Sequence, residues 1–211
     1  TSTGQTDFWP GPLTEEQQTG PDTCANWDRF FKVLGANVAE HRRNWRLAVE
    51  ANGGDPDGVE LDRSQIPEDL LGWPALGNPF FLEIHGFDLP IPQKGFRGLA
   101  GFEDVDNNLI YDPSRGDFPR VAIRRCQDRL PPSLPDEMIF WIYNDAGGIH
   151  TESNGDPIGM EVQVQAFSFQ TSDQINNMTF QRYRLVNRAD EPVDSTFFAM
   201  WVDPDLGCFR D

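Results

Sequence analysis

Lysine is nearly missing from this chain. Lys32 and Lys94 are the only lysines among its 17 basic residues, which stand against 34 aspartates and glutamates and give a formal net charge of -17. Phosphate backbones are bound by clustered positive charge, so this balance argues against a nucleic-acid partner. The acidic surface favours cations, or neutral ligands such as glycans, over anionic ligands.

Long apolar runs are missing as well. No stretch approaches the ~20 residues that a membrane-spanning helix needs, so we predict no transmembrane span, and no signal peptide opens the chain. The first residue is not methionine, and the last residues directly follow a strand-like run. We therefore expect the chain to be part of a longer precursor whose β-structure continues beyond residue 211.

Cysteine is scarce, with Cys24, Cys126 and Cys208 as its only copies. An odd count leaves one thiol without a partner if the compartment is oxidising. Cys208 lies close to the end and is expected to be that thiol, which makes Cys24 and Cys126 the candidate disulfide. Buried free thiols are the alternative, and spacing alone does not decide between the two.

Familiar catalytic motifs are also missing. The chain contains no G-x-S-x-G, H-E-x-x-H, P-loop or G-x-G-x-x-G sequence. Carboxylates are so frequent that a glycosidase-like pair could be chosen almost anywhere, and their presence therefore identifies nothing. From these observations we do not expect an enzyme.

Residues 1–135 are rich in proline and glycine and predict an irregular region that is anchored by aromatic residues, with one amphipathic helix at about 37–51. In this helix Asn37 and Glu40 have the spacing of a capping box. Its core-facing residues recur at helical spacing, namely Val38, His41, Trp45, Ala48 and Val49.

Residues 136–211 have a different character and predict antiparallel strands. Four runs rich in β-branched and aromatic residues begin with EMIFWIY and end with STFFAMWVD, and polar clusters separate them. In the second run Met160, Val162, Val164 and Ala166 alternate with polar residues, which predicts a buried apolar face and a wet polar face. The fold class we expect is mainly β, an antiparallel β-sandwich or jelly roll.

The segment GFEDVDNNLIYDPSRGDFP contains a candidate calcium loop between residues 104 and 117. Calcium accepts carboxylates, amides and backbone carbonyls together, and five residues here fall at alternate positions of a calcium-loop pattern: Asp104, Asp106, Asn108, the Ile110 carbonyl and Asp112. Leu109 stands where such loops place glycine, and Arg115 stands where an EF-hand places its bidentate glutamate. Asp117 is the candidate for the closing carboxylate. An Asx-rich surface turn is the alternative.

Two further acidic groups are weaker candidates. Asp203 and Asp205 form a D-x-D-x-G pattern at the end of a strand-like run, which suits half of a second metal site or a polar strand exit. Asp145 and His150 belong to a polar loop with two more carboxylates. We interpret that loop as structural, although a histidine beside carboxylates is also an acid–base or metal-binding combination.

Several strings in the chain resemble a family of large secreted proteins of Bacteroidota, whose members carry type IX secretion sorting domains or gliding-motility-associated C-terminal domains. The resemblance rests on DFWPGPL, WDRFFKV, GWPALGNP and the acidic segment from Gly101, and it extends through FWIYNDAGGIHTESNGDPIGM to WVDPDLG. The resemblance implies an acidic loop that usually reads closer to D-V-N-G-D-G, so Leu109 departs from the glycine of the family pattern.

The resemblance implies export to the cell surface or the medium, with further sequence upstream and downstream. It also implies O-glycosylation at Asp-Ser/Thr sequences, which makes Ser195 in DEPVDST the candidate acceptor, with an ordinary turn serine as the alternative. Together these observations predict an extracellular, calcium-stabilised structural or adhesive segment of a surface protein, with self-assembly or an extracellular polymer as its contact.

Two other functions stay open at this point. A glycan-binding module would present exposed aromatic side chains over a groove, for which the candidates are Trp73, Phe80, Phe81 and Trp141. A secreted hydrolase would need a pocket in which two carboxylates converge and at least one has a shifted pKa.

Overall fold

A five-stranded antiparallel sheet is the principal element of the structure, a computed structural model that describes residues 6–14, 16–90, 98–121 and 134–199. Strand β5 (Glu137–Asn144) pairs with β6 (Met160–Ser168), and β6 pairs with β7 (Thr179–Asn187). The short strands β1 (Trp9–Pro10) and β2 (Phe31–Leu34) pair with opposite ends of β5. Antiparallel β-structure and three of the four predicted strands are thus confirmed, whereas residues 195–199 of the fourth run form no strand.

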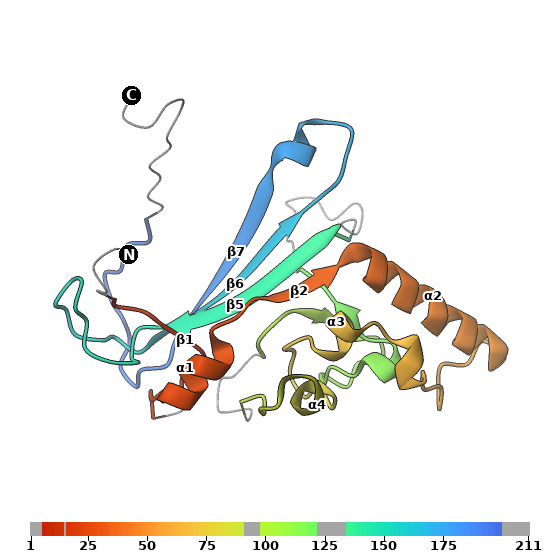
Figure 1. The fold of residues 1–211 in the computed structure, drawn as a ribbon, viewed down its shortest axis with the longest axis horizontal. Coiled ribbons are helices and arrows are strands. Elements are labelled where there is room, and N and C mark those ends of the chain that lie inside the picture. Colours follow the sequence, from red (N-terminus) through yellow and green to blue (C-terminus); the bar gives the residue numbers. More distant parts are fainter. Residues whose placement is uncertain (1–5, 15, 91–97, 122–133, 200–211) are drawn as a thin grey trace.

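The helices lie on one side of this sheet (Figure 1). They are α1 (Pro21–Trp27), α2 (Gly35–Ala51), α3 (Glu68–Leu71) and α4 (Phe81–His85). The region expected to be irregular therefore contains short regular pieces, which also include β3 (Phe102–Glu103), η1 (Arg63–Gln65), η2 (Pro113–Arg115) and β4 (Phe118–Pro119). The short helix η3 (Gln174–Asn177) precedes β7. None of the helices that the structure describes has the length and apolar character that crossing a bilayer requires.

Helix α2 confirms the predicted amphipathic helix but begins differently. Val38 and His41 are buried, and Trp45 and Ala48 pack partly buried against the core. The predicted capping box is wrong: no side chain caps the helix start, and the Asn37 amide instead donates to Asp69 Oδ2 of α3 at 2.8 Å. Asn37 thus contacts α3, which is distant in sequence, instead of capping the start of α2 as the local spacing predicted.

One hydrophobic core joins the two sequence regions. Along β5 the side chains alternate, so Met138, Phe140 and Ile142 are buried on the helix side of the sheet. They share a cluster with Trp27 of α1 and with apolar residues of the proline-rich part, among them Leu61, Leu70, Trp73, Phe81, Tyr111 and Val121. Residues on both sides of the expected boundary at 135 thus belong to one packed unit.

The polar residues of β6 overturn one prediction. Glu161, Gln163 and Gln165 were expected to face water, yet they are buried. They lie on the same face of the sheet as the core-facing residues of β5, and Gln165 is paired with Phe140. Partners distant in sequence satisfy them: Leu13 N–H donates to Glu161 at 3.0 Å, and Arg188 forms an ion pair with the same carboxylate at 3.0 Å. Buried polar groups are stable when they are paired in this way.

The opposite face of the sheet is apolar and partly open. Trp141, Val164 and Tyr183 lie next to one another across β5, β6 and β7 on this face. Tyr183 is 45% exposed, and Phe30, whose ring contacts Trp141 at 5.5 Å, is 70% exposed. In Figure 1 the helices lie on the other side, and within the described part of the chain no second sheet covers this face.

Candidate metal centre

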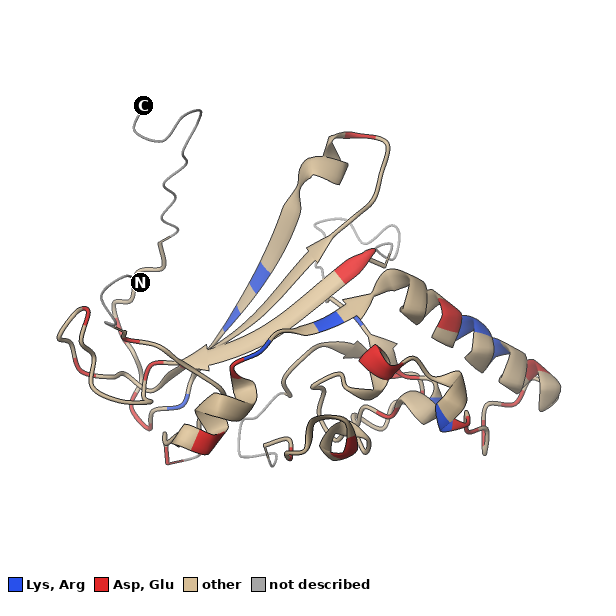
Figure 2. Ribbon diagram, viewed as in Figure 1, with Lys and Arg blue, Asp and Glu red and all other residues tan. Residues whose placement is uncertain are grey.

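The predicted acidic loop connects β3 to β4, which form a small two-stranded sheet of their own. Its acidic residues lie in a segment without a helical or strand period, so hydrogen bonds within the loop must fix its shape. Acidic side chains are distributed over many loops and helices of the molecule (Figure 2), and in this loop three of them come close together. It is the candidate functional site of the chain.

Three carboxylates of the loop converge. Asp104, Asp106 and Asp117 each offer an oxygen, and these oxygens lie within 4.8 Å of one another. Calcium binds oxygens at roughly 2.3 to 2.6 Å, so ligands of one ion lie at most about 4.6 to 5.2 Å apart. The spacing of the three oxygens is therefore compatible with a common centre.

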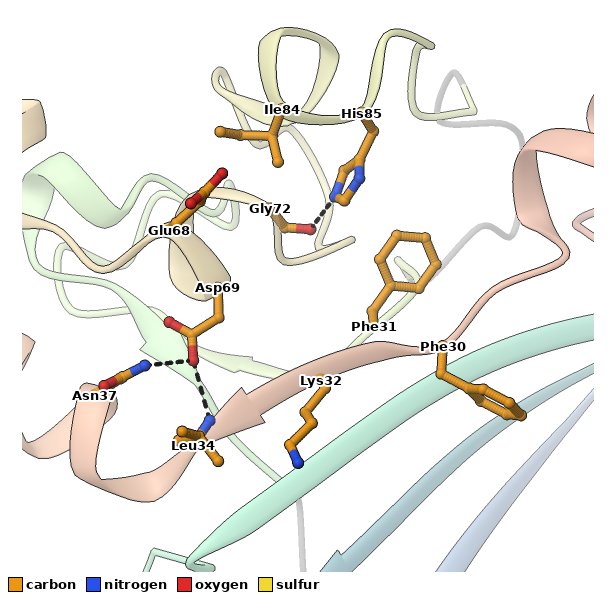
Figure 3. Close-up of a pocket in the computed structure, with 10 residues that line it drawn as sticks. All are labelled: Phe30, Phe31, Lys32, Leu34, Asn37, Glu68, Asp69, Gly72, Ile84 and His85. Carbon is orange, nitrogen blue, oxygen red and sulfur yellow. Dashed lines mark hydrogen bonds between the residues drawn. The ribbon is translucent and has the colours of Figure 1, made fainter.

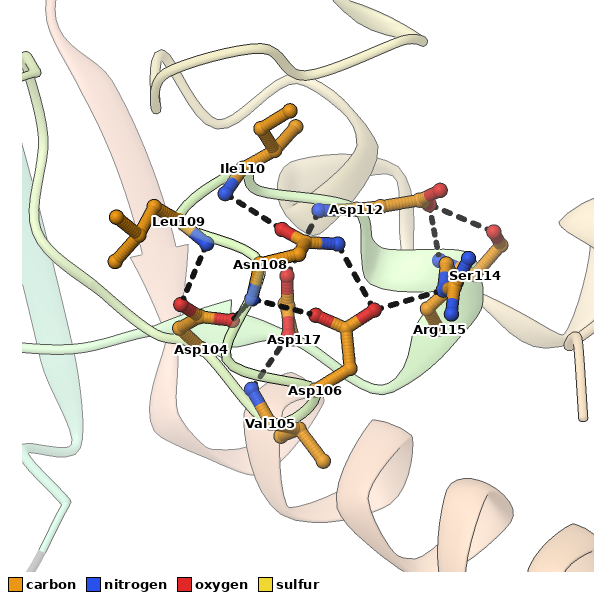
Figure 4. A network of polar contacts seen from close by, with 10 residues as sticks. All are labelled: Asp104, Val105, Asp106, Asn108, Leu109, Ile110, Asp112, Ser114, Arg115 and Asp117. Atoms are coloured by element: carbon orange, nitrogen blue, oxygen red, sulfur yellow. Dashed lines mark hydrogen bonds and ion pairs between the residues drawn. The ribbon is translucent and has the colours of Figure 1, made fainter. Parts of the chain in front are cut away.

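Backbone amides of the loop wrap around two of these carboxylates (Figure 4). The Asn108 N–H donates to Asp104 Oδ1 at 3.1 Å and to Asp106 Oδ1 at 3.2 Å, and the Leu109 N–H donates to Asp104 Oδ2 at 2.8 Å. These bonds turn the chain tightly around the side chains. Because a carboxylate oxygen has two lone pairs, Asp104 Oδ1, Asp104 Oδ2 and Asp106 Oδ1 each retain an acceptor site that a cation can use. Asp106 Oδ2 does not, because it accepts from Asn108 Nδ2 and Arg115 Nε.

The turn requires a backbone conformation that suits glycine. Leu109 has φ +67°, and Asn107 has φ +59°. Left-handed conformations of this kind are unfavourable for residues with a Cβ atom, least so for asparagine. The loop pattern places glycine at the position of Leu109, and the chain adopts the conformation that the pattern demands although the glycine is absent.

Asp117 is the most constrained of the three carboxylates. It is fully buried, and its two oxygens accept hydrogen bonds from the N–H groups of Val105 at 2.8 Å and Asp112 at 2.9 Å. Burial raises the pKa of Asp117 to about 6, the charges of Asp106 and Asp104 add to the rise, and the two hydrogen bonds oppose it. A bound cation would supply the positive charge that this group lacks.

One cation of the protein already contacts the cluster. Arg115 Nε lies 2.8 Å from Asp106 Oδ2, where it forms an ion pair that is partly exposed. Arg115 occupies the place of the bidentate glutamate of an EF-hand, so the protein offers a positive charge there instead of a ligand. With one guanidinium beside three carboxylates, the cluster keeps an excess of negative charge when all three are ionised.

The remaining predicted ligands have other roles or stay peripheral. The Asp112 carboxylate accepts from Ser114 N–H at 2.9 Å and caps η2, and it does not belong to the three converging carboxylates. Asn108 Nδ2 donates to Asp106 Oδ2 at 2.9 Å, and Ile110 is largely exposed. Asp117, proposed from the sequence as the closing carboxylate, is the residue that joins Asp104 and Asp106.

Helix α2 supports the loop through contacts that the sequence did not reveal. The buried His41 bonds through Nε2 to the Asp117 carbonyl at 3.0 Å, and because a carbonyl only accepts, this nitrogen donates. Burial lowers the pKa of His41 and so favours the neutral ring, while its hydrogen bond to Asp117 opposes the shift. Gly116, at φ +98°, approaches the ring of Trp45 so closely that an added Cβ would lie 2.5 Å from it. The helical face that carries His41 and Trp45 was predicted, but not what it contacts.

Three residues of other predicted sites lie outside the described residues, namely Asp203, Asp205 and Cys126. Cys24 is half-buried in α1, and its disulfide with Cys126 stays a prediction. Ser195 is exposed, as a glycan acceptor must be.

The loop that holds Asp145 and His150 is fixed by internal hydrogen bonds. Asp145 accepts from the N–H groups of Ile158 and Met160, both at 2.7 Å, and His150 Nε2 bonds to the Asp145 carbonyl. These bonds agree with the structural interpretation of this loop.

The residues chosen for a glycan platform do not form one. Trp73 is 0% and Phe81 is 1% exposed, and both belong to the core, so only Phe80 and Trp141 of the set reach the surface in part. The features expected of a hydrolase, a pocket and converging carboxylates with a shifted pKa, also do not coincide among the described residues. Asp117, which has the raised pKa, belongs to the acidic loop, whereas a hollow of about 500 Å³ elsewhere is lined by Glu68 and Asp69.

No family model, no curated protein and no solved structure matches the chain.

Proposed function

We propose that this chain is a calcium-stabilised β-sheet module of a secreted or cell-surface protein, with a structural or adhesive role and no reaction of its own. The observation that supports it most directly is the convergence of Asp104, Asp106 and Asp117 in a chain whose net charge is -17. A divalent cation reduces the repulsion among these carboxylates. It joins Asp104 and Asp106 to Asp117, whose backbone carbonyl contacts His41 of α2.

Calcium is the ion that the loop suits best. The loop offers carboxylates, a side-chain amide and carbonyls, and calcium accepts about six to eight such oxygens in flexible geometry. Magnesium prefers to keep several waters in a strict octahedron, which a loop crowded with protein oxygens leaves less room for. The absence of cysteine and histidine from the cluster argues against zinc.

Thermal unfolding with calcium and with chelator tests the proposal. If calcium binds the folded chain only, a concentration one hundred times its Kd stabilises the fold by about 2.7 kcal/mol, so the melting temperature rises by several degrees. Isothermal titration calorimetry gives the Kd. An identical melting curve in calcium and in chelator contradicts the proposal.

Two aspartate variants make the test specific. Asp106→Asn removes a carboxylate of the cluster and is expected to abolish most of the calcium response. Asp112→Asn changes the same residue type in the same loop, outside the cluster, and is expected to retain the response. If Asp112→Asn loses the response as well, the ligands follow the alternating sequence pattern, which includes Asp112. If Asp106→Asn keeps the response, the converging triad does not bind the ion.

We also propose that the sheet is one layer of a β-sandwich, and that sequence beyond residue 211 of the longer protein supplies the second layer. Leu185 and Tyr183 lie on the open face and are 47% and 45% exposed, which leaves apolar area that a second sheet would bury. The double variant Leu185→Lys/Tyr183→Lys is expected to be nearly neutral in this chain and to destabilise a longer form. Equal effects in both forms contradict the sandwich.

Export and glycosylation belong to the same proposal. Ser195 is exposed beside Asp194 and Thr196, so a sugar attached to it would face solvent. Mass spectrometry of the peptide from Val193 to Met200, isolated from the native source, is expected to show added hexose mass. An unmodified mass throughout that material contradicts this part of the proposal and leaves the calcium site untouched.

A further inference from the structure

A hollow lies away from the acidic loop, at the edge of β2 that pairs with no strand of the described residues. This hollow of about 500 Å³ separates the edge from α3 and α4 (Figure 3). Its walls combine apolar and acidic side chains, with Phe31 and His85 toward one end, Glu68 and Asp69 toward the other, and Ile84 between them.

The backbone of β2 presents unpaired groups to this hollow. Gly35 N–H donates to the Asp136 carbonyl at 2.8 Å, which fixes the alternation of the antiparallel ladder. With Lys32 opposite Ile139 and Leu34 opposite Glu137, the N–H and C=O of Lys32 and Leu34 point away from β5. The bond from Leu34 N–H to Asp69 Oδ2, at 3.0 Å, confirms this direction.

The backbone N–H and C=O of Lys32 face the middle of the hollow. Among the described residues neither its N–H nor its C=O has a hydrogen-bond partner, and its side chain lies on the other side, 3.0 Å from Glu137. An unpaired strand edge beside a hollow is the arrangement to which an extended peptide adds as a further strand.

The charges at the hollow indicate what such a peptide carries. Within the described residues Glu68 and Asp69 form no ion pair, and the buried Oδ1 of Asp69 accepts no hydrogen bond. A buried carboxylate oxygen without a donor is costly, so a ligand that brings an N–H or ammonium group to this end is favoured. Phe31 at the other end, with Ile84 between the two ends, favours an apolar side chain.

We propose that the β2 edge binds an extended peptide segment of another protein, which pairs with the backbone of Lys32 and carries an apolar residue within about three positions of a lysine or arginine. A second copy of this chain suits the site less well. Its own β2 segment carries two basic residues beside Phe30 and Phe31, but in the folded copy both already have a partner. Lys32 forms an ion pair with Glu137 at 3.0 Å, and the Arg29 guanidinium lies over the ring of Phe87.

A displayed library of random linear 12-residue peptides, selected on the wild-type chain, tests the proposal. We expect the selected sequences to share an apolar residue near Lys or Arg. A synthetic peptide of the selected sequence should bind Lys32→Pro at least about tenfold more weakly, because proline removes the free N–H. Lys32→Val loses the same ion pair with Glu137 but keeps the N–H, and it should bind within about twofold of wild type.

Two further measurements keep the test decisive. Glu68→Gln should weaken the basic peptide but not a version in which alanine replaces its Lys or Arg. If Lys32→Pro does not fold, the Lys32 amide signal of the wild-type chain is followed by NMR, and slowed hydrogen exchange on adding the peptide is expected. Equal binding to Lys32→Pro and Lys32→Val, or unchanged exchange at Lys32, overturns the proposal. Dimerisation of the chain that Lys32→Pro abolishes overturns the choice of partner.

Discussion

Leu109 holds a left-handed backbone conformation, φ +67°, while its side chain is 74% exposed. The conformation is unfavourable by about 1 to 2 kcal/mol for a residue with a Cβ atom, and little burial offsets it. Glycine accepts the conformation but adds entropy to the unfolded chain, about 0.5 to 1 kcal/mol. We therefore expect Leu109→Gly to raise the free energy of unfolding by up to about 1 kcal/mol in urea denaturation.

An exposed leucine in helical conformation provides the matched control. Leu82 is 51% exposed in α4, and Leu82→Gly is expected to lower the free energy of unfolding by about 1 kcal/mol. A loss of stability at both positions would mean that the Leu109 side chain contributes more than its exposure suggests.

His85 gives the fold a pH dependence. Burial lowers its pKa below the usual 6.5, its hydrogen bond with the Gly72 carbonyl opposes the shift, and nearby Arg29 adds to it. Below pH 6.5 the unfolded chain binds a proton at this residue before the folded chain does. Stability is therefore complete above 6.5 and falls as the pH drops from 6.5 toward the lowered folded pKa.

The variant His85→Gln isolates this contribution. It keeps a donor but does not titrate, so the unfolding free energy of wild type minus that of the variant should fall as the pH drops from about 7.5 to 5. The comparison uses the difference between the two curves, because Asp117, with its raised pKa, contributes a slope of opposite sign. Parallel curves would contradict the assignment to His85.

At the scale of elements, the buried ion pair between β6 and the end of β7 carries the largest predicted effect. Arg188 contacts both oxygens of Glu161, and the Glu161 side chain is fully buried. Arg188→Met leaves that carboxylate in the interior without its cation. We expect a loss of about 3 to 5 kcal/mol in urea denaturation.

Two comparisons test the cause of this loss. Arg46→Met breaks the exposed pair with Glu50 in α2 and should cost less than about 0.5 kcal/mol. The double variant Glu161→Gln/Arg188→Met should recover much of the loss, because no charge then stays buried. If the double variant is as unstable as Arg188→Met, the packing of the arginine side chain, and not its charge, accounts for most of the lost stability.

At the scale of the whole molecule, the net charge of -17 makes stability depend on salt. Self-repulsion of a highly charged chain destabilises its compact state, and salt screens it over about 10 Å at ~0.1 M. We expect the melting temperature to rise between about 20 mM and 300 mM NaCl. Calcium added at the higher salt should raise it further in wild type and not in Asp106→Asn.

The sequence by itself determined the features that depend on local periodicity and composition. Helix α2 and strands β5 to β7 were predictable because their side-chain periods of 3.6 and 2 extend over many residues. The acidic loop was predictable because side chains with carboxylate or amide oxygens occur at alternate positions of one short segment. Asp112 was assigned with the same pattern, which does not show that its carboxylate caps η2.

Only the tertiary structure decided which face each element buries and which groups meet. The alternation of β6 separated two faces correctly, but Arg188, Leu13 and the proline-rich part satisfy the polar face, and so Glu161 is inside. Trp73 and Phe81 were candidates for a surface platform and belong to the core instead. These outcomes depend on partners distant in the chain, because burial becomes favourable for a polar group only when those partners are brought to it.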